Sequence, residues 1–289
     1  MSRAASRIEA VVEARPPTWA RCLDPRGLVA VVRRHRDLIL HMIRRNVTAR
    51  YQGSFLGAGW AVLQPLLMLA VYTYVFGIVF QSRWRAESTG HVEFALTLFC
   101  GLIPFGLIGE TAANSPGIVV GHAAYVKRVV FPLEILPMTV VGSAFVVAAI
   151  STGVLLAAEA VMFQLPPPSA LLLPLAFVPC VLVALALAWL LAALGVFVRD
   201  TAAIVGFVMQ LLFFATPILY PPTAVPERFR LIVSLNPLAP IVEGFRALAL
   251  GLTPAPWRAL AVISVVALFA ALFCRALFLR AQRAFADVV

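Results

Sequence analysis

Residues 160–198 read AVMFQLPPPSALLLPLAFVPCVLVALALAWLLAALGVFV and contain no charged side chain. A second uncharged stretch separates Asp200 from Glu227. A helix needs roughly 20 mainly apolar residues to cross about 30 Å of hydrocarbon, and both stretches are long enough. A buried helix of a soluble protein is the alternative, but a soluble protein rarely holds several such runs. The pattern therefore predicts an all-α integral membrane protein.

The composition of the whole chain agrees with this interpretation. Of its 289 residues, 62% are hydrophobic and 12% are charged, whereas soluble domains are about 45–50% apolar. The net charge of +10 reflects 23 basic residues, of which all but Lys127 are arginine. Eleven of them precede Gly53, where they suit membrane orientation and anionic headgroups better than nucleic acid. We therefore expect no nucleic-acid partner.

Six membrane-spanning helices are predicted, and membrane helices tolerate the prolines that occur inside most of them. They lie at residues 56–80, 93–114, 133–160, 170–198, 201–221 and 257–279. With the N-terminus inside, 17 of the 23 basic residues fall in cytoplasmic segments, as the positive-inside rule requires. Both termini are then cytoplasmic, and residues 81–92, 163–169 and 222–256 lie outside. The first long apolar run begins near Phe55, too late for a cleaved signal peptide.

Three regions are expected along the chain. Residues 1–27 form an arginine-rich extension that looks poorly ordered, residues 28–53 an amphipathic helix in the membrane interface, and residues 54–289 the membrane domain. The apolar positions of the interfacial helix are Val32, Ile39, Met42 and Ile43. A plain solvated segment is the alternative interpretation of this helix.

Residues 222–256 hold two apolar pieces of about 10 residues between prolines. Each piece carries charge and is too short to cross the membrane. We expect a re-entrant or interfacial helical hairpin on the outer side, packed against protein.

The chain lacks a phosphate-binding loop, because no GxxxxGK[ST] pattern surrounds Lys127, its single lysine. If transport is driven by ATP, a separate subunit must hydrolyse it. Residues 114–134 begin with a Ser-Pro-Gly turn and end at Phe-Pro, which leaves room for a short helix between spans. This helix is interpreted as a docking element for a cytoplasmic partner, and an ordinary interfacial loop is the alternative. Its candidate contact residues are Val120, Tyr125, Lys127 and Arg128.

No metal site, disulfide framework or cofactor is expected from the cysteines and histidines, because both are dispersed and no CxxC pattern occurs. These residues are Cys22, Cys100, Cys180 and Cys274, with His35, His41, His91 and His122.

Three blocks of sequence resemble one family. They are RRNVTARYQGSFLGAGWAVLQPLLMLAVYTYVFGIVF at 44–80, SPGIVVGHAAYVKRVVFPLEILP at 115–137, and ATPILYP at 215–221 with LNPLAP at 235–240. They are similar to the permeases of O-antigen and related polysaccharide ABC exporters, the Wzm-type ABC-2 family. The first two blocks are quite specific, whereas the third is shared with other ABC-2 proteins.

The resemblance implies a homodimer of six-span subunits in the bacterial inner membrane, with two copies of a cytoplasmic ABC ATPase bound below. It implies export of an undecaprenyl-pyrophosphate-linked polysaccharide from cytoplasm to periplasm, with ATP and Mg bound by the partner. Capsular polysaccharide and teichoic acid permeases are close relatives. The resemblance does not cover the extension before residue 25.

Two sets of candidate site residues follow. Aromatic side chains suit a sugar channel, because flat apolar surfaces slide along sugar rings. They are Trp60, Tyr72, Tyr74, Phe76, Phe80, Phe213, Phe214 and Tyr220. For Phe80 and Tyr220 an interfacial aromatic belt is an equal alternative.

The second set is Arg44, Arg45 and Arg50, which precede the first span and could hold the pyrophosphate at a lateral gate while the sugar chain enters between spans one and five. Three glycines follow that would let a backbone or a ligand approach closely: Gly53, Gly57 and Gly59. The alternative is that these arginines only obey the positive-inside rule.

Three acidic residues near span ends, Glu110, Glu134 and Glu159, are expected to cap helices or reach to the interface rather than form a proton path. Two rival functions stay open: an ABC-2 exporter of drugs or small lipids, and an integral-membrane glycosyltransferase or polymerase. Asp200 is the single aspartate between Asp37 and Asp287, which argues against the enzyme.

Overall fold

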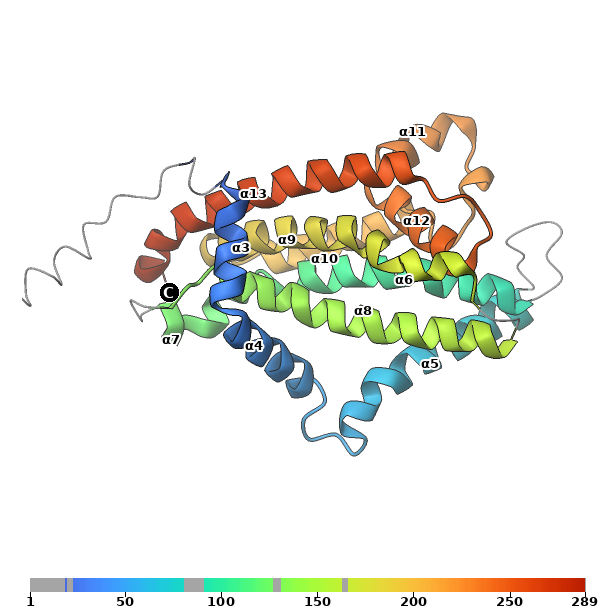
Figure 1. Ribbon diagram of the computed structural model, residues 1–289, viewed down its shortest axis with the longest axis horizontal. Helices are drawn as coiled ribbons and strands as arrows, with labels where there is room; N and C mark the ends of the chain where they lie inside the picture. Colours follow the sequence, from blue (N-terminus) through green and yellow to red (C-terminus); the bar gives the residue numbers. More distant parts are fainter. Residues whose placement is uncertain (1–18, 20–22, 81–90, 127–130, 163–165, 289) are drawn as a thin grey trace, which may run out of the picture.

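The structure, a computed structural model, describes residues 19, 23–80, 91–126, 131–162 and 166–288. The described residues form helices and no strand. Four long helices run beside one another along the molecule (Figure 1): α6 (His91–Asn114), α8 (Ile135–Met162), α9 (Leu173–Phe197) and α13 (Trp257–Val288). These four are long and apolar enough to cross a membrane. They match the second, third, fourth and sixth predicted spans.

The last helix is longer than predicted. We expected it to end at residue 279, but α13 continues to Val288. Residues 279–286 are rich in alanine, leucine and arginine, which favour helix, and contain neither glycine nor proline to stop it.

The other two predicted spans are short helices. α5 (Trp60–Tyr72) passes directly into the π-helical η2 (Thr73–Val79), and α10 (Thr201–Ala215) ends six residues before the predicted 221. Thr216 is extended, with ψ of 136°, as the residue before a proline prefers to be. At 1.5 Å per residue α10 is about 22 Å long, less than the hydrocarbon thickness. Six full spans thus remain a prediction.

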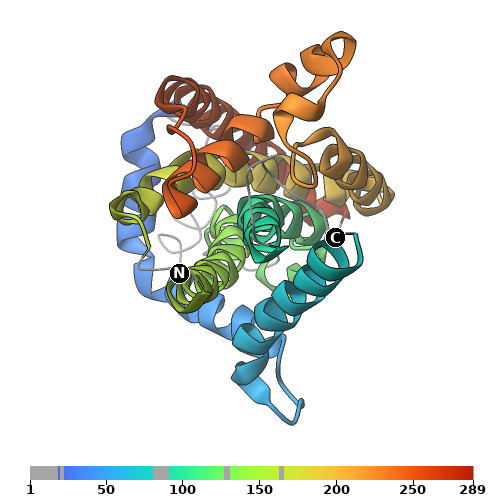
Figure 2. The same cartoon turned by 90° about the vertical axis from the view of Figure 1, so that its right-hand side faces the viewer.

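Helix α6 is the centre of the arrangement. Figure 2, which looks along the bundle, places it near the middle, with α5 and α10 toward the outside. It packs against α5, α8, α9, α10 and α12. Of its most apolar 18-residue window, 78% is buried.

The predicted hairpin is a bent helix pair. α11 (Arg230–Leu235) follows the short 3-10 turns η5 (Pro222–Ala224) and η6 (Glu227–Phe229), and it meets α12 (Leu238–Leu250) at 87°. Asn236 stabilises the bend: its Oδ1 accepts from Leu238 N at 2.9 Å, and its Nδ2 donates to Thr216 Oγ1 at 2.8 Å. α12 is packed against α6 and α9, as expected of an element covered by protein.

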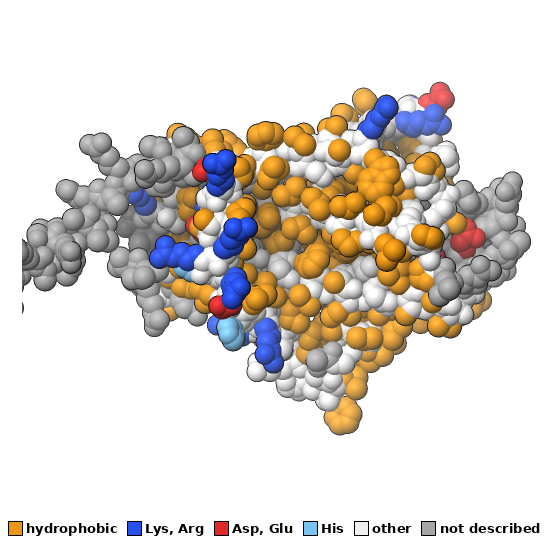
Figure 3. Space-filling view, in the orientation of Figure 1, with side chains coloured by type: hydrophobic (Ala, Val, Ile, Leu, Met, Phe, Trp, Pro, Cys, Tyr) orange, Lys and Arg blue, Asp and Glu red, His pale blue; other side chains and the backbone are white. Residues whose placement is uncertain are grey.

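The single interfacial helix that we predicted is broken at His35 into α3 (Pro25–Arg34) and α4 (Arg36–Ala49). α4 packs against α8 through Ile39 and Met42, which are buried, whereas Val32 of α3 is exposed. Ile43 lies directly over Gly142 of α8, where a side chain would collide with it. α3 crosses the bundle at the end where α7 and the C-terminus also lie (Figure 1), and basic side chains gather over α3 and α4 beside a broad apolar surface (Figure 3).

The short helix expected within residues 114–134 is present as η3 (Val120–His122) and α7 (Ala123–Val126). Val120 is 48% exposed, as a docking residue should be, and Val119 is buried. Tyr125 belongs to α7. Lys127 and Arg128 lie outside the described residues, as does most of the predicted extension at 1–27.

Trp19 is described within that extension, apart from the residues that begin at Leu23. Trp19 stacks on Phe273 of α13 with a centroid distance of 6.3 Å, and the guanidinium of Arg280 lies 4.0 Å from its ring centroid. This contact holds the start of the described chain against α13.

Candidate functional site

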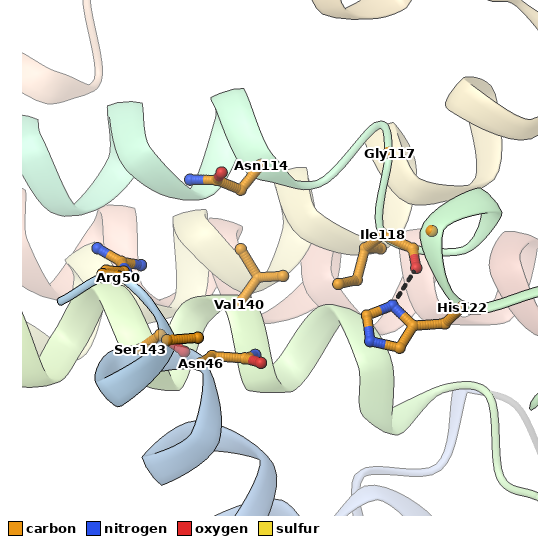
Figure 4. A pocket seen from close by; sticks show the side chains of 10 residues that line it. Asn46, Arg50, Asn114, Gly117, Ile118, His122, Val140 and Ser143 are labelled. Carbon is orange, nitrogen blue, oxygen red and sulfur yellow. Dashed lines mark hydrogen bonds between the residues drawn. The ribbon is translucent and has the colours of Figure 1, made fainter. Parts of the chain in front are cut away.

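Two cavities share Arg50, the residue that follows α4. The first, which we call the loop cavity, has a volume of about 430 Å³ and lies between α4, α8 and the loop after α6. Figure 4 shows its side chains. Its lining residues are Asn46, Ala49, Arg50, Asn114, Gly117, Ile118, Gly121, His122, Val140 and Ser143.

The second, the helix cavity, has a volume of about 450 Å³ and lies between α5, α6 and α8. Its lining residues are Arg50, Tyr51, Ala61, Gln64, Pro65, Met68, Tyr72, Phe99, Leu102, Gly106, Glu110, Val147 and Ser151. From Glu110 to Phe99 this wall follows α6 for about 16 Å. It therefore offers an elongated, mostly apolar groove with a few polar groups, as ligand sites usually do.

An ion pair between Arg50 and Glu110 stands where the two cavities meet. The Arg50 side chain is 31% exposed and that of Glu110 is 23% exposed. The sequence suggested a cap or an interfacial contact for Glu110. Instead, its position near the end of α6 directs the carboxylate at the guanidinium that ends α4. Arg50 is thus the predicted gate arginine that the structure places in a cavity wall.

The other two gate arginines lie elsewhere on α4. Arg45 Nη2 is 3.1 Å from His122 Nε2, and His122 Nδ1 is 2.9 Å from the Ile118 carbonyl oxygen. Because a carbonyl only accepts, Nδ1 carries the hydrogen and Nε2 accepts from Arg45. Arg44 is exposed and lines neither cavity. Arg45 therefore joins α4 to the predicted docking loop.

Two of the glycines after Arg50, Gly53 and Gly57, have a left-handed backbone conformation. Gly53 and Gly57 have φ of 81° and 50°, which glycine adopts at no steric cost. Nothing lies within 4 Å of the position that a Cβ would take on either. Their role in the close approach of a ligand or a second backbone remains a prediction.

The aromatic residues of the first predicted span form a connected row. Phe76 lies 6.4 Å from Tyr72, 5.9 Å from Phe80 and 5.6 Å from Phe94 of α6, centroid to centroid. Tyr72 lines the helix cavity. Tyr74, 60% exposed, lines an apolar groove of about 650 Å³ between α5 and α8, and Trp60 is half-buried at the start of α5.

The aromatic residues of α10 form a separate group. Phe213 packs edge-on against Phe105 of α6 at 5.5 Å and against Phe214 at 5.3 Å. Tyr220 donates to the Phe214 carbonyl at 2.9 Å. Phe105, the residue of α6 that this group contacts, lies about 16 Å along the helix from Phe94. One chain therefore does not gather the eight aromatic residues into one cavity, and their channel role remains a prediction.

Sequence reasoning missed a buried arginine in α12. Arg246, assigned to an outer segment, is 4% exposed, and its guanidinium donates to the carbonyls of Thr97, Pro217 and Ile218 and to Glu243. A Cβ at Gly101 would lie 2.7 Å from its Nη2. An arginine inside an apolar segment was the available signal, because such a residue must find partners.

The remaining two acidic residues are buried. Glu134 Oε2 accepts from Arg275 Nε at 2.7 Å, and the Glu134 carbonyl accepts from Trp189 Nε1 at 3.1 Å. Glu159 is 8% exposed, and its Oε2 has no hydrogen-bond partner within the described chain. The expected capping or interfacial roles of Glu134 and Glu159 remain predictions. In the described part of the chain, no three His, Cys, Asp or Glu side chains come together as metal ligands would.

Comparison with known proteins agrees with this architecture. The chain is 30% identical to the O-antigen export system permease protein RfbA of Myxococcus xanthus over 249 residues, which cover 84% of this chain and 93% of that protein. It is 28% identical to the protein of the same name from Klebsiella pneumoniae over 213 residues, 73% of this chain and 80% of that one. Residues 37–250 match the ABC-2 type transporter family. A match over most of the chain, around a bundle of membrane-length helices, shows that the protein belongs to the ABC-2 type transporter family.

Proposed function

We propose that the chain is the membrane subunit of an ATP-driven exporter that moves O-antigen, carried on undecaprenyl pyrophosphate, from cytoplasm to periplasm. The observation that carries this proposal is the similarity to O-antigen export permeases over 84% of the chain. The helix cavity agrees with it, since a groove with Arg50 at one end and Tyr72 near the other suits an anion attached to sugars or lipid.

The energy source is a second protein in this proposal. Two copies of a cytoplasmic ABC ATPase bind ATP and Mg, while this chain is not catalytic and needs no cofactor of its own. Val120, Tyr125, Lys127 and Arg128 contact the ATPase. Movement there reaches α4 through the Arg45–His122 contact.

The proposed placement is the bacterial inner membrane with both termini in the cytoplasm. α3, α7 and the C-terminus lie toward the same end of the molecule (Figure 1), and basic side chains gather there (Figure 3). The bent pair α11–α12 lies toward the other end and would face the periplasm.

A homodimer completes the channel in this proposal. Tyr74 in η2, Phe80 just after η2 and Phe214 in α10 are each at least 60% exposed. A second copy could bring the two aromatic groups together across the dimer axis, which one chain does not do. Arg50, with Arg44 and Arg45 nearby, would receive the pyrophosphate.

Deleting the gene tests the proposal. Surface O-antigen should disappear while polymer linked to undecaprenyl pyrophosphate accumulates inside, and a plasmid copy should restore export. If capsule or teichoic acid disappears instead, the exported substrate is that related polymer and not O-antigen. Normal surface polymer with new drug sensitivity would favour the small-molecule exporter and overturn the proposal.

A further inference from the structure

Glu110 forms an ion pair with Arg50, whose guanidinium lies in the lining of both cavities. Arg50 lines the loop cavity and the helix cavity, and Glu110 lines the helix cavity beside it. Their ion pair therefore stands at the point where a ligand would pass from one cavity to the other.

We infer that Glu110 is a latch: it holds the Arg50 guanidinium in the empty protein, and a lipid-borne phosphate or pyrophosphate displaces it on binding. The inference rests on the proposed function. Carboxylate and phosphate bind a guanidinium through the same planar arrangement of donors, so the two anions compete for it. Glu110 thereby sets which headgroups are strong enough to enter.

The burial of this pair distinguishes it from a purely structural one. Arg275 and Glu134 are 5% and 11% exposed, and Arg246 is 4% exposed with carbonyl partners around it. The guanidinium groups of Arg246 and Arg275 are thus enclosed by protein, although the Glu243 carboxylate beside Arg246 is 28% exposed. Arg50 and Glu110 are about a third and a quarter exposed and adjoin two cavities, so a second anion can approach.

The cavity walls also offer the displaced carboxylate a new partner and the ligand a path. Gln64 lines the helix cavity together with Glu110, and its amide can donate to a carboxylate. Asn46 and Asn114 line the loop cavity on the other side of Arg50. Opening the pair would join the two cavities with the headgroup at Arg50 and the attached chain along α6.

The test measures binding to the full permease–ATPase complex in phosphatidylcholine nanodiscs. Farnesyl pyrophosphate and phosphatidic acid are the two probes, because an isoprenoid pyrophosphate and a phospholipid headgroup share the same chemistry. Glu110→Gln should tighten binding by about three- to tenfold, since it removes a competing anion of modest strength. Arg50→Gln should weaken binding at least as much. A structural pair would instead give weaker binding in both variants.

The control is Glu227→Gln, which removes the same charge from an 89% exposed side chain away from both cavities and should leave binding unchanged. Should Glu110→Gln fail to assemble, Glu110→Asp shortens the reach and should still tighten binding, by a smaller factor. Unchanged or weaker binding in the Glu110 variants, with normal binding to the unaltered complex, overturns the latch alone. If Glu110→Gln tightens and Arg50→Gln weakens the binding of phosphatidic acid but not of farnesyl pyrophosphate, the latch is supported and the proposed substrate is overturned. No binding of either probe overturns both.

Discussion

Arg246 and Arg50 are the same residue type in two different situations. Arg246 is 4% exposed, and its donors are directed at three backbone carbonyls and one carboxylate. Arg50 is about a third exposed, forms an ion pair with one carboxylate, that of Glu110, and lines two cavities. An arginine enclosed by carbonyls stabilises a fold, whereas one that holds a single displaceable anion can bind a ligand. Surroundings, not residue type, separate the two roles.

The largest expected effect is the loss of the enclosed arginine. Arg246→Ala leaves the carbonyls of Pro217 and Ile218 and the Glu243 carboxylate unpartnered, which should lower the free energy of unfolding by about 3–5 kcal/mol. Thermal unfolding of the purified chain in detergent would measure it. Gly101→Ala should act in the same direction by displacing the guanidinium. Arg258→Ala, an exposed residue at the start of α13, is the control. If Arg246→Ala unfolds at the same temperature as the control, Arg246 does not stabilise the fold and does not differ from Arg50 in that role.

The second effect concerns the pair between the docking loop and the last helix. Glu134→Gln should lower stability by about 1.5–3 kcal/mol, because Arg275 would keep its charge in a buried place. The double variant Glu134→Gln with Arg275→Met should recover part of the loss. Chemical unfolding of the three variants measures the coupling. Equal losses in the single and double variants would show that the charge pairing itself contributes little.

A smaller effect should follow from removing the contact between α4 and the docking loop. His122→Ala removes the acceptor of Arg45, and polymer export by the reconstituted complex should fall by roughly two- to fivefold with assembly intact. His41→Ala, an exposed histidine on the same helix as Arg45, is the matched control. Export that stays normal in His122→Ala would mean that the contact does not transmit motion.

The smallest effect is expected at a solvent-exposed pair. Arg230 and Glu227 are 58% and 89% exposed, with 3.5 Å between Nη1 and Oε1. Arg230→Ala should change the free energy of unfolding by less than about 1 kcal/mol, because exposed ion pairs contribute little. The same thermal assay measures it. A large loss here would mean that α11 is held by its charges rather than by the bend at Asn236.

Much of the fold follows from the sequence because a membrane helix must be long and apolar. The uncharged stretches predicted α9 and the start of α10, and the prolines between short apolar pieces predicted the bent pair α11–α12. The predictions failed where local geometry decides. Pro217 ended α10 early, and His35 broke the interfacial helix in two. These breaks depend on the φ and ψ angles of single residues, which hydropathy does not report.

The sequence by itself determined that this is a helical membrane protein with a basic N-terminal side and no phosphate-binding loop, because charge, apolar length and motif spacing are properties of the chain alone. Its resemblance to polysaccharide permeases is also written there. Only the tertiary structure decided which arginines hold the protein together and which one faces a cavity. Arg50 meets Glu110 across 60 residues, and Arg246 reaches the Thr97 carbonyl across 149. Such partners come from separate helices, and only packing brings them within hydrogen-bonding distance.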